Sequence, residues 1–199
     1  MINFIDLNSS KPYQVFEDLY KNALENQQDN IDAICISSYD NYKSEVNSRY
    51  VNLKYIKDNK WVFFTNYDSP KNQEFKTHSQ ISCIFFWHNT NTQIRIKAEI
   101  SKLDYESSDE HFFERSKDKN AVAISSDQSQ KIISYEQVVK NYKAVLNSGR
   151  NLSKRPDNWG GYYFIPYYFE FWTGHESRIN KRLTFDLNNN FWEESILQP

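Results

Sequence analysis

Glycine is scarce in this chain of 199 residues, which has only four, at positions 149, 160, 161 and 174. Neither a G-x-G-x-x-G dinucleotide fingerprint nor a G-x-x-x-x-G-K-[ST] phosphate loop can be written with them. A G-x-S-x-G nucleophile elbow is absent as well. Any nucleotide-like ligand would therefore have to be held by side chains and by the amides of turns.

Cysteine is rarer still, with Cys35 in AICIS and Cys83 in ISCIFFW. Both lie in apolar runs of strand character, which favours buried, reduced thiols over a disulfide or a nucleophile. The four histidines, at 78, 88, 111 and 175, show no spacing typical of metal ligands. We therefore expect no metal site.

The chain also lacks a strong excess of either charge and any long apolar run. Its 24 Lys and Arg against 26 Asp and Glu give a net charge of -2, without a basic tail, which argues against a nucleic-acid partner. No basic segment followed by an apolar run opens the chain, and no apolar stretch approaches the ~18 residues that span a bilayer. We expect no membrane partner and, by default, a cytoplasmic location.

Aromatic residues, by contrast, are abundant, with 14 Tyr, 14 Phe and 5 Trp. This composition is far too apolar for disorder, and it suits β-strands and stacked ligands. No Gly/Ser-rich or Pro-rich linker interrupts the sequence. We expect one domain over 1–199, with a candidate flexible segment at 1–12.

Hydrophobic periodicity predicts an N-terminal helix followed by strands. Residues 9–26 begin with Ser and an early Pro and then repeat apolar residues at helical spacing. Five runs of strand type lie between 32 and 103, and the last of them alternates apolar and polar residues as a strand with one buried face does. Extended segments return over 162–172, 178–187 and 191–198. Pro166 removes one ladder bond, so its strand should lie at an edge or carry a bulge.

Two further helices are indicated by capping boxes. Ser107 with Glu110 precedes one, and Ser134 with Gln137 precedes the other, which Gly149 closes. Strands in series without alternating helices favour an α+β protein with an antiparallel sheet, closed into a barrel with the helices outside. A doubly wound parallel sheet is disfavoured.

The segment EFWTGHESRINKR near the C-terminus concentrates cations. If it is extended, Arg178, Asn180 and Arg182 project from one face, with Arg178 and Arg182 about 13 Å apart by strand rise. Arg49 and Lys54 share another strand, where their odd spacing places them on opposite faces unless a bulge intervenes.

The segment FFTNYDSPK runs from a strand into a turn rich in hydroxyl groups. Thr65, Ser69 and Lys71 could donate hydrogen bonds to a phosphate there. Taken in isolation, an ordinary hairpin loop is the better interpretation of this segment.

Seven blocks taken together are more specific than any one of them. The succession RYVNLK, VFFTNYDSPK, FFWHNTNTQ, FFERSKDKNAVAISSDQS, WGGYYFIP, EFWTGHESRINKR and LQP resembles the pyridoxamine 5'-phosphate oxidase family from about Phe16 onward. The resemblance implies a split β-barrel homodimer with FMN at the subunit interface. It also implies oxidation of pyridoxine or pyridoxamine 5'-phosphate to pyridoxal 5'-phosphate, by hydride transfer from the substrate C4' to flavin N5, with O2 as electron acceptor.

The resemblance also implies two sets of site residues. The flavin ligands would be Arg49, Tyr50, Val51, Lys54, Phe64, Thr65, Lys71, Gln93, Gln128, Ser129, Trp172 and Arg182. The substrate pocket would be lined by Lys54, Arg115 and Arg178, and Arg178 and Asn180 would stand at the catalytic positions.

The sequence departs from the family mainly on the substrate side. Where the family usually reads R-x-H-D-R, this chain reads RINKR, so Asn180 replaces a histidine and cannot gain a charge near neutral pH. Where the family has a Tyr and a Ser for the substrate phosphate, this chain has His111 and Lys119, which can still bind an anion. Pro70 replaces the usual Arg before Lys71 and cannot bind one.

These departures leave three functions open. The first is an FMN-dependent oxidase of a B6 5'-phosphate. The second keeps FMN and oxidises a different planar, anionic ring, as relatives in phenazine biosynthesis do. The third is a non-catalytic module that binds FMN or pyridoxal phosphate.

Overall fold

The computed structural model describes residues 1–199. The elements are, in order, β1 (Asn3–Ile5), α1 (Lys11–Glu25), β2 (Ala33–Asp40), β3 (Glu45–Lys57), β4 (Lys60–Asn66), α2 (Pro70–Thr77), β5 (Gln80–Trp87), the 3-10 turn η1 (His88–Thr90), β6 (Thr92–Lys102), α3 (Tyr105–Glu114), α4 (Lys117–Ser125), α5 (Tyr135–Leu146), β7 (Trp159–Thr173), β8 (Lys181–Asn188) and β9 (Phe191–Ile196). No helix is long and apolar enough to cross a bilayer.

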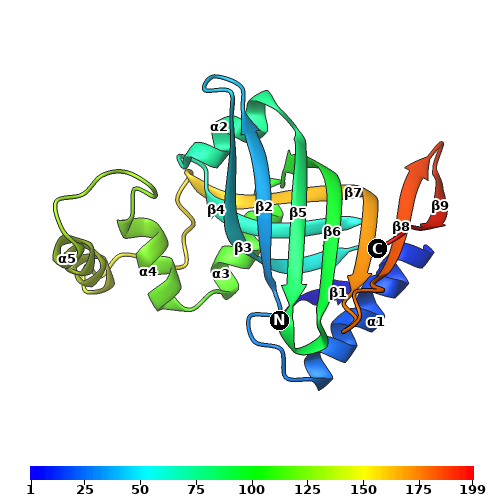
Figure 1. The fold of residues 1–199 in the computed structure, drawn as a ribbon. Coiled ribbons are helices and arrows are strands. Elements are labelled where there is room, and N and C mark those ends of the chain that lie inside the picture. Colours follow the sequence, from blue (N-terminus) through cyan, green and yellow to red (C-terminus); the bar gives the residue numbers. More distant parts are fainter.

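Six strands close into a barrel, as the strand pattern predicts (Figure 1). The ring runs β3, β2, β5, β6, β7, β4 and back to β3, with antiparallel pairing at every step. Outside the ring, β1 joins β3 in parallel and β8 and β9 extend the sheet from β7. The candidate flexible segment therefore includes a short paired strand.

The 15-residue strand β7 serves both the barrel and its extension. Its first part pairs with β4, and its last part pairs with β8. The register with β6 shifts where Ala98 faces Pro166 and Lys97 faces Tyr168. The structure thus confirms a bulge beside Pro166, which bends β7 from one partner toward the next.

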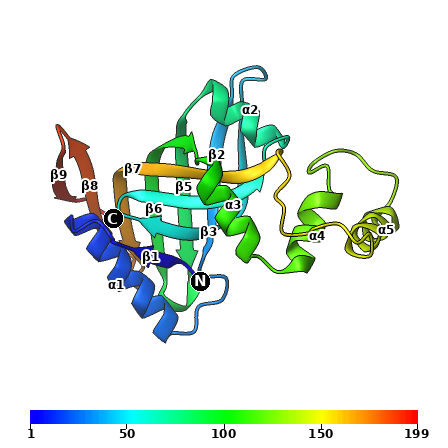
Figure 2. The ribbon, with the colours of Figure 1, turned by 180° about the vertical axis from the view of Figure 1, so that it is seen from behind.

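The core fills the barrel and extends under α1, which lies across one end of the barrel (Figure 2). Phe16 of α1 is fully buried and lies 4.5 Å from Trp61 and 5.6 Å from Phe85 between ring centroids. These aromatic contacts explain why α1 needs no strong cap, since a buried apolar face stabilises a helix more than its end groups do.

On the other side of the barrel, α4 and α5 form a helical arm, defined here as residues 117–146, that projects from the barrel (Figures 1 and 2). α5 buries none of its residues within the chain. Ser134 caps α5 by accepting a hydrogen bond from the Gln137 amide, as predicted, and Gly149 follows the helix with φ of +68°.

Two local predictions were wrong. The segment after Asn66 is not a hairpin loop, because Ser69 and Pro70 begin the helix α2. The helix α3 begins earlier than predicted, since the carboxylate of Asp104, not Ser107, caps it by accepting from the Ser107 amide at 2.7 Å. A carboxylate is a better cap than a hydroxyl here because its negative charge also interacts favourably with the positive end of the helix dipole.

Candidate functional site

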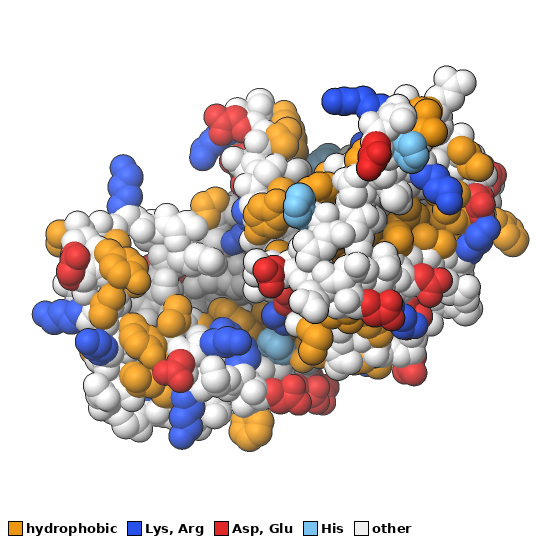
Figure 3. All heavy atoms as spheres, turned by 60° about the horizontal axis from the view of Figure 1, so that its bottom comes forward, with side chains coloured by type: hydrophobic (Ala, Val, Ile, Leu, Met, Phe, Trp, Pro, Cys, Tyr) orange, Lys and Arg blue, Asp and Glu red, His pale blue; other side chains and the backbone are white.

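A cavity of about 930 Å³ lies between the barrel wall and the helical arm. It is within the size range of small-molecule sites. The surface is hollowed between arm and barrel (Figure 3). Twelve of the predicted site residues line this cavity, namely Arg49, Tyr50, Val51, Lys54, Phe64, Thr65, Lys71, His111, Arg115, Lys119, Gln128 and Ser129.

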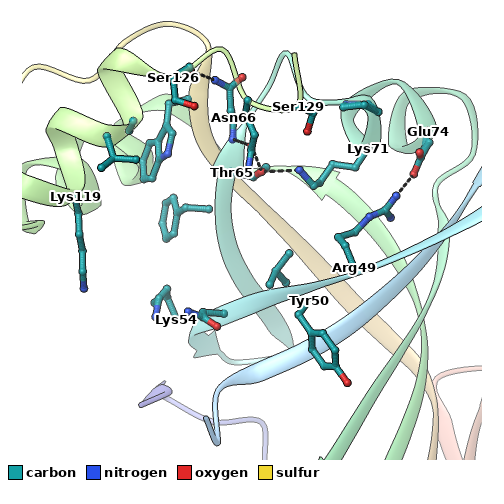
Figure 4. Close-up of a pocket in the computed structure, with 18 of the residues that line it drawn as sticks. Arg49, Tyr50, Lys54, Thr65, Asn66, Lys71, Glu74, Lys119, Ser126 and Ser129 are labelled. Atoms are coloured by element: carbon teal, nitrogen blue, oxygen red, sulfur yellow. Dashed lines mark hydrogen bonds and ion pairs between the residues drawn. The ribbon is translucent and has the colours of Figure 1, made fainter. Parts of the chain in front are cut away.

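Lys71 is the most unusual of these residues. It is only 8% exposed, and its ammonium donates to the hydroxyl of Thr65 at 3.1 Å (Figure 4) and to that of Ser69 at 2.8 Å. No carboxylate forms an ion pair with it. Burial and the nearby Arg49 lower the pKa of Lys71 to about 8. A buried ammonium held only by hydroxyls is ready to receive an anion, because an anion would restore the interactions lost with water.

Arg49 lies next to Lys71 and is already paired. Its guanidinium lies 2.6 Å from the buried carboxylate of Glu74 (Figure 4) and also donates to the hydroxyl of Ser38. Glu74 lies on α2, three residues after Lys71, so α2 supplies both a cation for the cavity and the carboxylate that orients Arg49. The ion pair therefore holds the Arg49 guanidinium in one orientation at the wall of the cavity.

A β-bulge brings Lys54 to the same cavity as Arg49. The β3–β4 register passes from Leu53 opposite Phe63 to Tyr55 opposite Val62, which leaves Lys54 as the extra residue. The odd spacing of Arg49 and Lys54 would place them on opposite faces of a regular strand, but this bulge brings both to the same cavity. The Lys54 ammonium lies 3.0 Å from Asp32.

The loop after α4 closes the cavity over β4. The side-chain oxygen of Gln128 accepts from the Thr65 hydroxyl and from the Asn66 amide, both at 3.3 Å. Ser129 follows with φ of +71°. Tyr50, in contrast, is 73% exposed and points away from Lys71 (Figure 4).

Aromatic rings form the wall nearest α3. Phe64 lies flat against His111, with centroids 3.8 Å apart, and is parallel to Trp159 at 5.4 Å. The Arg115 guanidinium lies 4.4 Å over the Trp159 ring, and its Nη1 atom is buried without a hydrogen-bond partner. Burial lowers the pKa of Arg115, and no carboxylate neutralises it. Arg115 is thus a second cation in need of an anion.

Three other predicted flavin ligands lie outside this cavity. Gln93, Trp172 and Arg182 sit opposite one another on β6, β7 and β8, and we call them the outer row. The Arg182 guanidinium is paired with Glu170, which is 2% exposed and also binds Arg95. The cations beside the outer row are therefore already matched by a buried carboxylate.

Arg178 and Asn180 do not share a strand face with Arg182, so that prediction was wrong. β8 begins only at Lys181, and Arg178 lies in a turn with φ of +60°. The side-chain oxygen of Asn180 accepts from the His175 amide at 3.1 Å, which holds the loop together. Arg178 is exposed and lines no part of the cavity.

Several site residues were not predicted. Glu74 and Tyr55 act on predicted residues, and Trp159 lines the cavity directly. The Ser-Pro start of a helix was a usable signal for Glu74. Glu170 could have been singled out as a lone carboxylate in the aromatic run FEFW, because such a group is buried only when it is paired.

The donor set fits a phosphorylated, planar ligand. Hydroxyls, amides and two cations without carboxylate partners suit a phosphate, and the ring stack suits an aromatic group. The barrel and this cavity define a split-barrel protein with two unpaired cations beside an aromatic wall.

Comparison with known proteins identifies the family. Residues 21–148 match the family model described as pyridoxamine 5'-phosphate oxidase, and residues 159–199 match the pyridoxine 5'-phosphate oxidase C-terminal dimerisation region. The chain belongs to the pyridoxamine 5'-phosphate oxidase family.

Curated relatives support this assignment along nearly the whole chain. A pyridoxine/pyridoxamine 5'-phosphate oxidase of Hydrogenovibrio crunogenus is 34% identical, over 94% of this chain and 88% of its own length. One of Rhodopirellula baltica is 33% identical, over 96% and 88%.

Solved structures show the same architecture. PhzG from Burkholderia lata, in complex with tetrahydrophenazine-1-carboxylic acid, has a TM-score of 0.89 at 25% identity, covering 96% of this chain and 93% of that one. An FMN-binding protein of Nostoc punctiforme has a TM-score of 0.80 at 12% identity, covering 96% and 100%, and shows the fold alone.

Proposed function

We propose that this protein is an FMN-dependent oxidase that converts a B6 5'-phosphate, pyridoxine or pyridoxamine 5'-phosphate, to pyridoxal 5'-phosphate with O2 as acceptor. The observation that carries the proposal is the buried ammonium of Lys71, which binds two hydroxyls and no carboxylate. The names of the curated relatives supply the substrate class.

Different residues of the cavity are assigned to the flavin and to the substrate. Lys71 would neutralise the flavin phosphate, Thr65 and Ser129 would hydrogen-bond to it, and Arg49, oriented by Glu74, would add a further donor. When bound, FMN supplies the electron acceptor of the reaction. Lys54 and Arg115 would orient the substrate anion, which makes alignment and charge neutralisation the main tasks of this chain.

The site is proposed to form between two copies of the chain. The outer row of Gln93, Trp172 and Arg182 lies outside the cavity, so one chain holds only part of the flavin set. A partner would bring its own outer row to the cavity, as an isologous dimer requires. The dimerisation region matched by residues 159–199 supports this arrangement, since it contains Trp172 and Arg182.

A second candidate keeps FMN and changes the substrate to a larger carboxylated ring. Its support is the likeness to a PhzG structure holding tetrahydrophenazine-1-carboxylic acid, together with His111, Lys119 and Asn180 at the altered positions. A carboxylate and a phosphate use the same donors, so the cations alone do not separate the two candidates.

Anaerobic mixing tests both candidates. The purified protein, loaded with FMN, is mixed without O2 with pyridoxamine 5'-phosphate or with tetrahydrophenazine-1-carboxylic acid. Bleaching of the flavin absorbance by pyridoxamine 5'-phosphate alone supports the first function, and bleaching by the phenazine compound alone supports the second. If neither compound bleaches a tightly bound flavin, both oxidase proposals fail and a non-catalytic binding module remains.

A further inference from the structure

His111 is held on one face and one edge. Its ring lies 3.8 Å from Phe64 with the two planes 8° apart. Tyr55 stands edge-on to the same ring, at 5.4 Å and 87°, with its hydroxyl 2.7 Å from His111 Nδ1. The imidazole therefore has one orientation, set by a stack and a hydrogen bond.

The relative hydrogen-bonding strengths of the two groups assign the proton between them. The Tyr55 hydroxyl makes no other hydrogen bond in the chain. A phenol O–H is a stronger donor than a neutral imidazole N–H, and an imidazole nitrogen is a stronger acceptor than a phenol oxygen, so the hydroxyl donates and Nδ1 accepts. Burial, with Glu114 and Glu110 nearby, raises the pKa of Tyr55 and keeps that proton in place.

A neutral imidazole whose Nδ1 accepts carries its hydrogen on Nε2. Burial, together with the cations Arg115, Lys54 and Lys119, lowers the pKa of His111 to about 4, so the ring is neutral at neutral pH. Nε2 makes no hydrogen bond within the chain, and the side chain lines the cavity. The free N–H is therefore available to a ligand.

We propose that Tyr55 is a positioning residue that holds His111 as an Nε2–H donor, so that His111 gives a neutral hydrogen bond to an oxyanion of the substrate. The proposal deepens the proposed function and rests on it only for the identity of that substrate. Lys119 and Arg115 would supply the attraction, while His111 would select the direction from which a phosphate or carboxylate oxygen approaches.

Nitrogen NMR on the full chain tests the positioning directly. Long-range proton–nitrogen spectra of the purified protein should show His111 as a single tautomer, with Nδ1 bare and Nε2 protonated. Tyr55→Phe keeps the ring and removes the hydroxyl, so His111 should become a mixture of tautomers. A native His111 protonated on Nδ1, or a single Nε2–H tautomer that survives Tyr55→Phe, would overturn the proposal.

Tyr39 offers a matched control. Its ring stands edge-on to His78 at 5.9 Å and 75°, close to the Tyr55 geometry, but without a hydrogen bond between the two. Tyr39→Phe should leave the tautomers of both His78 and His111 unchanged. These spectra need neither flavin nor turnover, so a failure of the oxidase proposal is distinguishable from a failure of this one.

Ligand probes identify the acceptor. Titration with inorganic phosphate or with benzoate should shift the Nε2 and its proton in the native protein, and the probe that acts at the lower concentration names the preferred oxyanion. No shift with either would overturn the role of His111 as a donor.

The flavin-loaded enzyme gives a kinetic readout. His111→Ala should raise KM for pyridoxamine 5'-phosphate about three- to tenfold, and more than it lowers kcat, as the loss of one neutral hydrogen bond predicts. Tyr55→Phe leaves part of the His111 population as Nε2–H and should raise KM less, by about twofold. His111→Gln keeps a neutral N–H donor and should bind better than His111→Ala. Equal KM for the Gln and Ala variants would argue against a hydrogen bond at this position.

Discussion

The cavity contains cations without a carboxylate partner, whereas the two arginines beside the outer row are both paired. In the cavity, the Lys71 ammonium is buried with two hydroxyls, and the Arg115 guanidinium has a buried nitrogen with no partner. Beside the outer row, Arg182 and Arg95 share the buried carboxylate of Glu170. Arg49 and Lys54 of the cavity are paired with Glu74 and Asp32, but Lys71 and Arg115 have no carboxylate partner, whereas both arginines beside the outer row have one. In the proposed flavin site, the cavity would therefore supply most of the electrostatic binding energy, and the outer row would supply shape and hydrogen bonds.

The largest effect is expected when the altered cavity and the altered outer row lie on different chains of one dimer. Lys71→Ala and Arg182→Ala should each be weakly active alone. When the two variants are refolded together, random pairing should restore about a quarter of the intact sites, because each mixed dimer has one unaltered cavity facing one unaltered outer row. The measurement is oxidase activity before and after mixing.

The control pairs Lys71→Ala with Thr65→Ala, two changes within one cavity. This mixture should recover nothing beyond the average of its components. Recovery equal to that of the first mixture, or none in either, would contradict a site shared between subunits.

The next effect concerns the buried carboxylate. Glu170→Gln leaves Arg95 and Arg182 facing each other without a counter-charge, so the free energy of unfolding should fall by about 2–3 kcal/mol. Chemical denaturation at a fixed protein concentration measures it. Asp186→Asn, on the neighbouring strand β8 and exposed, has no ion pair and should change stability little. Equal losses in both variants would show that the ion pairs of Glu170 stabilise the fold no more than an exposed carboxylate does.

Removal of Lys71 should change FMN affinity more than it changes the free energy of unfolding. Lys71→Ala should weaken FMN binding by about 10- to 100-fold, the loss of one charge-assisted contact, with little loss of stability in the flavin-free protein. Calorimetric titration with FMN measures the affinity. Lys76→Ala, on the same helix but exposed, is the control. Unchanged affinity in Lys71→Ala would contradict the phosphate assignment.

The smallest effect is a pH dependence. The pKa of Lys71 is lowered to about 8, so above pH 8 the flavin-free protein loses the proton that phosphate binding requires. FMN affinity should therefore fall as pH rises through 8, by up to about tenfold per pH unit, while the phosphate itself stays a dianion. Lys71→Arg keeps its charge and should remove this dependence. A flat profile in the native protein would show that Lys71 remains charged or does not contact the phosphate.

The sequence predicted the elements better than the site. The helix at 11–25, the strand at 92–102 and the bulge beside Pro166 follow from local patterns, and the structure confirms them. The prediction that Arg178 and Arg182 share a strand face was wrong, because alternation along a strand does not show where the strand begins.

The sequence could not predict the bulge at Lys54 or the pairing of Arg49 with Glu74, for a different reason. A bulge depends on the partner strand, and an ion pair depends on two segments that meet only after folding. Tyr55 was missed for the same reason, since its contact with His111 joins β3 to α3.

The sequence by itself determined the barrel and the membership of the family, because strand periodicity and ordered motifs are local properties of the chain. Only the tertiary structure decided which cations are free. Whether Lys71 or Arg182 has a carboxylate beside it depends on burial and on residues distant along the chain, and composition carries no record of either.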